Sequence, residues 1–413
     1  MRGGRASAAV GACLVLAAAA AADPSAYEPG VDPGLGFNLI SWANYGAGGE
    51  AVWQAAVQDL YDHGFRHVSV CPVRFFDPAT GAIAATSPKA PDLAHIAAGI
   101  ARAKSLGMTV TVNPFVEYEN FTHWRGEWDP PGGAIATQFW TDYQQYISDV
   151  ATMAQANGAD RMTIGTELKA IVNKSAHNAA VTGVITAADA AFTGPLGYAA
   201  NWDNYTDPNL TATVWENPKI DFVGIDAYFH FQLATDAQAD ASGPHPDAAF
   251  IAIVEANWDS ILDGDILPFA AARKGGAGMP VIFTEHGLIP YNRTTVIPYA
   301  GPGAGQPVDQ AEQINGYNGL LNALDGRADD DDLLETYLWQ WGMPGAEGSY
   351  WYLNPSGVDD LSTPFNESLG NPAAQYLSGY VPEPATLALV AVGAAVALGR
   401  GRRNRVVPRR AGR

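Results

Sequence analysis

Cysteine and basic residues are scarce in this 413-residue chain, and each shortage excludes a class of protein. Of the two cysteines, Cys13 lies in an apolar N-terminal leader, so Cys71 is alone in the mature chain and no internal disulfide can form. Nine of the 23 Lys and Arg residues are arginines in the two terminal segments, so the body between them is more acidic than the whole-chain charge of −20. Such a body is not expected to bind nucleic acid or an anionic membrane, whereas a neutral polymer is a compatible partner.

Both ends of the chain are predicted to be processing signals rather than parts of the fold. Residues 1–22 begin with two arginines near the N-terminus and continue in an apolar run that ends in small residues, which is typical of a secretory signal peptide. At the other end, Val381–Pro384 (VPEP) precedes an apolar run, Thr386–Leu398, and an arginine-rich tail. That run is short for a transmembrane helix and would cross a membrane only together with its flanks.

The C-terminal segment, residues 381–413, resembles the PEP-CTERM sorting signal of Gram-negative bacteria, because a PEP motif, an apolar helix and an arginine cluster follow one another. The resemblance implies export, recognition by an exosortase and removal of the tail. A single folded domain is then expected to span residues 23–380.

Short apolar runs alternate with longer segments of helical periodicity between these ends. The predicted strands are Leu35–Ile40, His67–Cys71, Thr109–Asn113, Met162–Gly165, Leu196–Ala200, Phe222–Asp226, Val281–Thr284 and Thr336–Trp339. The predicted helices are Glu50–His63, Pro91–Leu106, Ala136–Asn157, His177–Ala190, Asn209–Trp215, Asp247–Gly264 and Asp309–Leu324. Repeated strand and helix units with strands of the buried parallel type predict an α/β fold, a (β/α)8 TIM barrel, rather than an open doubly wound sheet. No Gly-rich dinucleotide or phosphate motif follows the first strand.

The residues just past each strand carry the functional prediction, since the active site of such a barrel lies at the C-terminal ends of its strands. Most of them are carboxylates, amides and aromatic rings: Trp42 and Asn44; Arg74; Asn113 and Glu117; Glu167; Asn201 and Trp202; Asp226 and Tyr228; Glu285 and His286; Trp339 and Trp341. Sugars offer an apolar ring face for stacking and hydroxyl groups for hydrogen bonds, and this set of side chains suits both. The inventory therefore indicates a carbohydrate site.

Two of these carboxylates stand in similar sequence contexts. Met279–Leu288 (MPVIFTEHGL) is a short apolar strand that leads to Glu285, and Arg161–Ala170 (RMTIGTELKA) leads in the same way to Glu167. A single Glu at a strand end is equally well explained as a solvated loop residue or a helix-capping partner. Two of them at the ends of two strands are what glycoside hydrolysis requires, one as acid/base and one as nucleophile or base.

Five motifs in order resemble glycoside hydrolase family 113, β-mannanases of the large retaining clan of TIM-barrel glycosidases. They are WRGEW at Trp124–Trp128, GTEL around Glu167, YAANWD at Tyr198–Asp203, VGIDAYF around Tyr228 and FTEHG around Glu285. The resemblance covers roughly Gly36 to Trp341.

The resemblance implies a role for each matching residue. Glu167 would be the general acid/base and Glu285 the nucleophile, while Arg74 and Tyr228 would hydrogen-bond the nucleophile. A cation and a phenol donor would hold that carboxylate ionised, whereas the acid/base needs a raised pKa. Trp339 would lie under the reactive sugar. The other predicted substrate-binding residues are Trp124, Arg125, Asn201 and Trp202, which match family positions near the cleft, and the strand-end residues Trp42, Asn113, Asp226, His286 and Trp341.

Two positions depart from the pattern of the clan. Thr166 precedes the acid/base where many members have an Asn that binds the sugar 2-hydroxyl. His286 follows the nucleophile where an aliphatic residue is more usual, and it would either line the cleft or serve as a structural residue.

The first hypothesis is a secreted retaining endo-β-glycosidase that cleaves β-1,4-mannan or glucomannan by double displacement, with no metal or organic cofactor. Its partners would be a β-linked polysaccharide and exosortase-type sorting machinery. The same chemistry on another β-glycan, such as β-glucan or galactan, stays open because substrate choice depends on the loops. The second hypothesis is an exported, non-catalytic glycan-binding surface protein on the same barrel, against which stands the complete set of catalytic residues.

Overall fold

The computed structural model describes residues 34–343, apart from 120, 122, 231–241, 304, 326 and 328–331, together with residues 353, 373 and 377. The predicted signal peptide at 1–22 and the sorting tail at 381–413 lie outside the described residues, as does the apolar run within that tail. In the described part of the chain, no helix combines the length and hydropathy that a membrane span requires.

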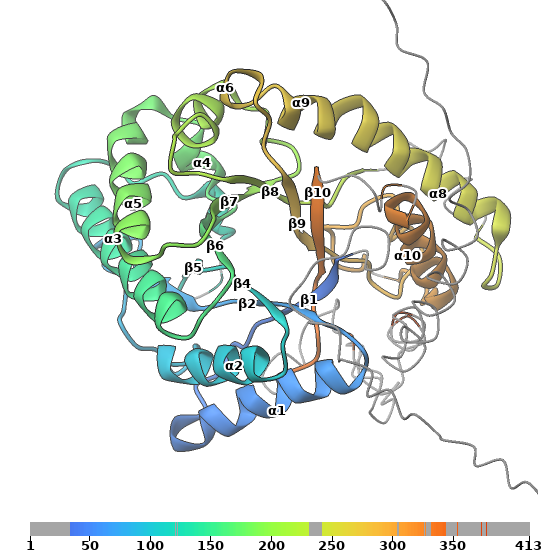
Figure 1. The fold of residues 1–413 in the computed structure, drawn as a ribbon, viewed down its shortest axis with the longest axis horizontal. Coiled ribbons are helices and arrows are strands. Elements are labelled where there is room, and N and C mark those ends of the chain that lie inside the picture. The colour runs from blue at the N-terminus through green and yellow to red at the C-terminus, as the bar shows by residue number, and fades with distance from the viewer. Residues whose placement is uncertain are drawn as a thin grey trace, which may run out of the picture. The chain divides into compact units, whose positions relative to one another are not determined.

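Eight parallel strands close into a barrel, so the predicted TIM-barrel fold is confirmed (Figure 1). Around the barrel the order is β1, β10, β9, β8, β7, β6, β4 and β2. The strands are β1 (Leu35–Leu39), β2 (His67–Val70), β4 (Thr109–Val112), β6 (Arg161–Thr166), β7 (Leu196–Asn201), β8 (Phe222–Asp226), β9 (Val281–His286) and β10 (Leu333–Leu338). Each contains one of the predicted strands or overlaps it, because strands buried on both faces read as short continuous apolar runs.

Helices surround the barrel and bury their apolar faces against it (Figure 1). They are α1 (Gly49–Asp62), α2 (Leu93–Ser105), α3 (Gly133–Ala156), α4 (Lys169–Val172), α5 (Asn178–Ala191), α6 (Pro208–Leu210), α8 (Ala248–Ile261), α9 (Leu267–Ala271) and α10 (Gln310–Asp325). π-Helical turns at Thr211–Trp215 and Leu262–Ile266 extend α6 and join α8 to α9. Asp247 accepts hydrogen bonds from the backbone N–H groups of Ala249 and Phe250 and so caps α8.

A small second sheet, which the sequence analysis did not predict, lies beyond two of the barrel strands. β3 (Val73–Phe76) follows β2 after two residues, and β5 (Phe115–Tyr118) follows β4 in the same way. β3 and β5 pair in parallel, with Arg74 opposite Val116 and Phe75 opposite Glu117. The sheet continues the direction of β2 and β4 past the barrel and therefore builds part of the rim on which the predicted active site lies.

A buried polar network occupies strand positions away from that rim. Glu335 of β10 pairs with Arg161 of β6 and lies 3.2 Å from Nδ1 of His67, and the hydroxyl of Tyr337 donates to it at 2.6 Å. Burial alone would raise the pKa of Glu335, but Arg161 and His67 outweigh burial and lower that pKa to about 2. This carboxylate therefore joins three strands of the barrel in its ionised form.

Candidate active site

Three side chains hold the carboxylate of Glu167, which follows β6 directly. Asn201 donates to Oε1 at 2.6 Å, and the indole of Trp124 and Nη2 of Arg125 donate to Oε2 at 2.8 and 2.7 Å. The backbone of Glu167 has φ 51°, a left-handed conformation that is unfavourable for a residue with a side chain. The turn that leaves the strand is thus held in an uncommon conformation that places this carboxylate among its three donors.

Glu285 lies near the end of β9 and is buried. The hydroxyl of Tyr228 donates to its Oε2 at 3.0 Å, and Nη2 of Arg125 lies 3.9 Å from its Oε1. Burial and the negative charge of Glu167 raise the pKa of Glu285 to about 8, although Arg125 and Tyr228 act in the opposite direction.

Arg125 connects the two carboxylates through a single nitrogen. Its Nη2 is 2.7 Å from Glu167 and 3.9 Å from Glu285, so the two nearest carboxylate oxygens cannot be further apart than the sum of these distances. Its Nη1 pairs with Glu117 at 2.6 Å, and its guanidinium lies 4.6 Å from the ring centre of Phe115. The barrel therefore brings the two predicted catalytic carboxylates face to face around one buried cation.

The pKa of Glu285 differs from the sequence-based expectation, which gave an ionised carboxylate to the nucleophile and a raised pKa to the acid/base. In this structure the pKa of Glu285 is raised because that carboxyl is buried beside the negative charge of Glu167, while its phenol donor and the Arg125 cation, 3.9 Å away, act in the opposite direction. The surroundings of Glu285 therefore favour its protonated form.

Residues 41–346 match the family model described as Glycoside Hydrolase Family 113. The chain belongs to glycoside hydrolase family 113. Residues 381–403 match the PEP-CTERM protein-sorting motif. No curated protein matches this sequence.

Solved structures of family 113, and one of a GH5_18 protein, share the fold of this chain. A GH113 β-1,4-mannanase has a TM-score of 0.62 at 16% identity, over 84% of this chain and 97% of that one. The GH113 β-mannanase AaManA from Alicyclobacillus acidocaldarius, in complex with ManMIm, has a TM-score of 0.57 at 18% identity, with the same coverage. A GH5_18 protein from Streptomyces cattleya, in complex with Manβ1-4GlcNAc, has a TM-score of 0.51 at 14% identity, over 85% of this chain and 80% of that one.

Arg74 does not lie where its predicted role requires. Its Nη1 donates to the backbone carbonyls of Val73 and Pro91 at 3.0 and 3.4 Å, and among the described residues it forms no hydrogen bond or ion pair with Glu285. The reason is the small sheet, since Arg74 belongs to β3 and not to the end of β2. Arg125, which the sequence analysis assigned only to substrate binding, is the arginine beside both carboxylates in this family 113 chain.

Two other predicted substrate-binding residues face the helices instead of the barrel mouth. Trp341 is 0% exposed, packs edge-on against Phe37 and Phe65, and donates its indole N–H to Asp59 of α1 at 2.9 Å. His286 is buried with its Nδ1 2.9 Å from the carbonyl of Ala227, and burial lowers its pKa to about 4. Neither side chain exposes a surface that a sugar can contact, so the prediction that Trp341 and His286 bind substrate is wrong.

Asn113 and Asp226 are fully buried beneath the carboxylates. Asn113 Oδ1 accepts hydrogen bonds from the hydroxyls of Thr163 and Thr166 at 2.6 and 2.8 Å. The hydroxyl of Thr284 donates to Asp226 at 2.7 Å, and burial together with Glu285 raises the pKa of Asp226 well above its usual range. Both side chains therefore support the site from below rather than bind substrate, and Thr166 uses its hydroxyl in the same internal network.

The remaining predicted side chains are accessible around the rim. Trp42, Asn201, Trp202 and Trp339 are half-buried, and Trp124 is 37% exposed. Trp339 stacks on Phe115 with ring centres 5.6 Å apart and an interplanar angle of 29°. Two rings that are even more open, those of Phe121 and Tyr299, could not be predicted from the sequence because they lie in loops where no strand end marks them.

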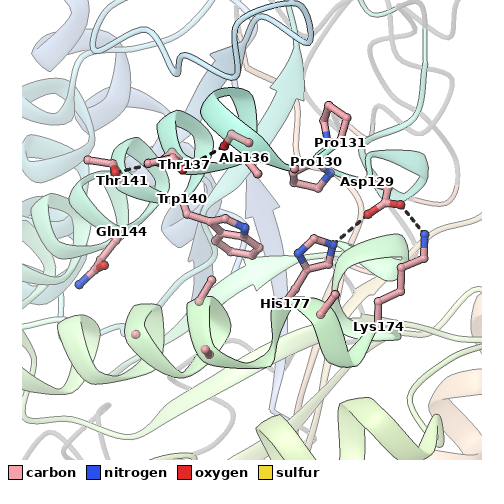
Figure 2. A pocket seen from close by; sticks show the side chains of 16 residues that line it. Asp129, Pro130, Pro131, Ala136, Thr137, Trp140, Thr141, Gln144, Lys174 and His177 are labelled. Atoms are coloured by element: carbon pink, nitrogen blue, oxygen red, sulfur yellow. Dashed lines mark hydrogen bonds and ion pairs between the residues drawn. The ribbon is translucent and has the colours of Figure 1, made fainter.

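A groove of about 830 Å³ lies away from this site, between α3 and α5 (Figure 2). Trp140 and His177 face one another across it with ring centres 5.7 Å apart, and Asp129 pairs with His177 at 2.9 Å and with Lys174. None of the predicted catalytic residues is among its lining residues. The paired carboxylates, and not this groove, mark the candidate active site.

Across the described residues, no group of three or more His, Cys, Asp or Glu side chains is arranged to hold a metal ion.

Proposed function

We propose that this family 113 chain is a retaining endo-β-glycosidase that hydrolyses β-1,4-mannan or glucomannan. The observation that carries the proposal is the position of Glu167 and Glu285 on either side of Arg125 Nη2, at 2.7 and 3.9 Å. The carboxyl groups of retaining glycosidases are about 5–5.5 Å apart, and those of inverting enzymes are further apart to admit a water. One nitrogen that reaches both carboxylates supports the shorter spacing.

The reaction would proceed by two displacements at the anomeric carbon. Glu285 attacks that carbon while Glu167 gives its proton to the glycosidic oxygen, so the bond to the departing sugar breaks and a glycosyl ester forms on Glu285. Glu167, now ionised, takes a proton from a water whose oxygen attacks the same carbon. The ester bond breaks, Glu285 regains its electron pair, and the sugar leaves with its original anomeric configuration.

Attack requires an ionised Glu285, so the carboxyl whose pKa is raised to about 8 must lose its proton when substrate binds. Arg125 is the group able to bring this about. A small shift of its Nη2 from Glu167 toward Oε1 of Glu285 would stabilise the negative charge on the nucleophile and remove a donor from the acid/base. Substrate hydroxyls that displace Arg125 from Glu167 would drive this shift.

β-Mannan is the proposed substrate because the family model covers most of the barrel and two structurally similar proteins are described as a β-1,4-mannanase and a β-mannanase. The accessible Trp42, Trp124, Trp202 and Trp339 support a polymeric sugar ligand, since indole rings pack well on sugar faces. β-Glucan and galactan are the competing substrates.

The ends of the chain support a place outside the cytoplasm. Residues 1–22 have the pattern of a secretory signal peptide, and residues 381–403 match the PEP-CTERM sorting motif. We propose export in a Gram-negative bacterium to the cell surface, periplasm or medium, with an exosortase-type enzyme acting on the tail.

The test is sugar release from β-mannan, glucomannan, β-glucan, xylan and galactan by the unaltered protein, Glu285→Ala and Glu167→Ala. We expect mannan-selective release that both substitutions abolish. On a β-glycosyl fluoride, whose leaving group departs without a proton, azide should restore activity in both variants, giving an α-glycosyl azide with Glu285→Ala and a β-glycosyl azide with Glu167→Ala, because it replaces the nucleophile in one and the activated water in the other. Glycan binding without release by the unaltered protein would support the non-catalytic alternative.

A further inference from the structure

Three aromatic rings from three different loops meet beside the predicted acid/base. Trp202 follows β7, His230 follows β8, and Tyr299 lies in the loop after β9. The ring centre of His230 is 4.8 Å from that of Trp202 and 4.9 Å from that of Tyr299. Trp202 and Tyr299 are stacked at 6.0 Å with an interplanar angle of 15°. The three loops together present one aromatic surface.

Tyr299 does not have the burial of a core residue. It is 47% exposed although it is stacked on Trp202, and Trp202 and His230 are only half-buried. An exposed ring removes little apolar area from water and so contributes little to the stability of the fold. Open, stacked ring faces are instead suited to packing against the apolar face of a sugar.

The position of this surface relates it to the departing sugar. Asn201, the residue before Trp202, donates to Oε1 of Glu167 at 2.6 Å. In the proposed reaction Glu167 gives its proton to the glycosidic oxygen, and that oxygen leaves with the departing sugar. The aromatic surface therefore starts one residue from the side chain that holds the acid/base.

A separate aromatic group lies toward β1 and β10. The backbone N–H of Trp339 donates to the carbonyl of His286, the neighbour of Glu285, at 2.7 Å. Trp42 and Trp339 pack on one buried cluster that includes Phe115. This group is placed to contact the sugar that Glu285 attacks. The rings that follow β7, β8 and β9 are then available to contact the sugars beyond the cleaved bond.

We propose that Trp202, His230 and Tyr299 form a platform for the departing sugars, so that a glycan chain extends past the cleaved bond over these three rings. This assignment rests on the proposed function, and it makes Tyr299 a determinant of action within a chain rather than at its end.

The experiment compares two substrates that differ only beyond the cleaved bond. The first is a β-1,4-manno-oligosaccharide, and the second is a β-glycosyl fluoride that carries only the sugars transferred to Glu285. Fluoride is too small to occupy the platform and leaves without a proton from Glu167. We expect Tyr299→Ala to lower the kcat/KM ratio of oligosaccharide to fluoride about tenfold, the loss of one stacking contact. Tyr299→Phe, which keeps the ring, should retain most of that ratio.

Val308→Ala is the matched control, because Val308 is 61% exposed in the same loop and outside the platform, and it should leave the ratio unchanged. A loss of equal size on both substrates, or no loss on the oligosaccharide, would overturn the platform while the proposed function stands. Failure of the unaltered protein to hydrolyse either substrate would overturn the proposed function and the platform with it.

Discussion

Arg125 Nη2 lies 2.7 Å from Oε2 of Glu167, and this buried ion pair links a residue of the loop after β5 to the end of β6. The same nitrogen lies 3.9 Å from Glu285, so one guanidinium stands beside both carboxylates and lowers the pKa of Glu285. The proposed reaction requires an ionised Glu285, and Arg125 is a cation placed to favour that ionised form.

Arg125→Gln should lower kcat/KM at least tenfold and move the acidic limb of its pH profile to higher pH. Arg125 lowers the pKa of Glu285, which burial and Glu167 raise to about 8, so loss of the cation raises that pKa further. A nucleophile with a higher pKa needs a higher pH to ionise. The size of the loss follows from one hydrogen bond to a charged group, about 1.5–3 kcal/mol. The measurement is kcat/KM against pH, and an acidic limb at unchanged or lower pH would contradict the argument.

Arg74→Gln tests whether Arg74 contacts the nucleophile, as the sequence suggests, or bonds only to backbone carbonyls, as in the structure. Its guanidinium bonds to the carbonyls of Val73 and Pro91, so its loss should reduce stability by about 2 kcal/mol and leave the acidic limb in place. Thermal unfolding measures the loss of stability, and the pH profile of kcat/KM shows whether the acidic limb moves. If the acidic limb moved as it does in Arg125→Gln, Arg74 would have to contact Glu285 in the complex with substrate.

Local sequence patterns were sufficient to predict the barrel, but not to predict toward which side of each strand its side chains point. Buried parallel strands are apolar on both sides, so the sequence does not tell whether His286 and Trp341 point to the barrel mouth or to the helices. The identity of the arginine beside Glu285 depends on the small sheet that carries Arg74 away, and Tyr299 has no local signal because loop residues lack periodicity. By contrast, Glu167, Glu285 and Tyr228 followed from motifs at strand ends, and the structure brings them together.

Tyr228→Phe should weaken the nucleophile without changing the fold. The phenol donates to Oε2 of Glu285 at 3.0 Å and lowers the pKa of that carboxyl. We expect kcat/KM to fall by roughly 10- to 100-fold, the equivalent of one hydrogen bond to a charged group, with the acidic limb at higher pH. Steady-state kinetics on oligosaccharide and on glycosyl fluoride should show similar losses, because both substrates need the nucleophile. A loss confined to the oligosaccharide would count against this role.

Gly126→Ala tests the contact between Trp124 and the acid/base without replacing either residue. A Cβ at this position would lie 2.3 Å from the indole of Trp124, so the ring must move away and its N–H leave Glu167. We expect about a tenfold lower kcat/KM on oligosaccharide, similar to Trp124→Phe, and a smaller effect on the fluoride, which needs no acid. Gly183→Ala in α5 is the control, since its added Cβ would meet only Gln144, at 3.7 Å. It should leave activity unchanged.

Glu335 should make the barrel sensitive to acid in a defined pH range. Its pKa in the folded protein, about 2, is below its ordinary value of 4.5, so its stabilisation is complete above pH 4.5 and disappears as the pH falls toward 2. The difference corresponds to about 3 kcal/mol. Glu335→Gln should therefore be much less stable than the unaltered protein at pH 6, and the two should converge as the pH falls toward 3. Thermal unfolding across this range measures the convergence, with Glu50→Gln on the exposed face of α1 as the control. A stability difference that stays constant from pH 6 to pH 3 would show that Glu335 does not act through its charge.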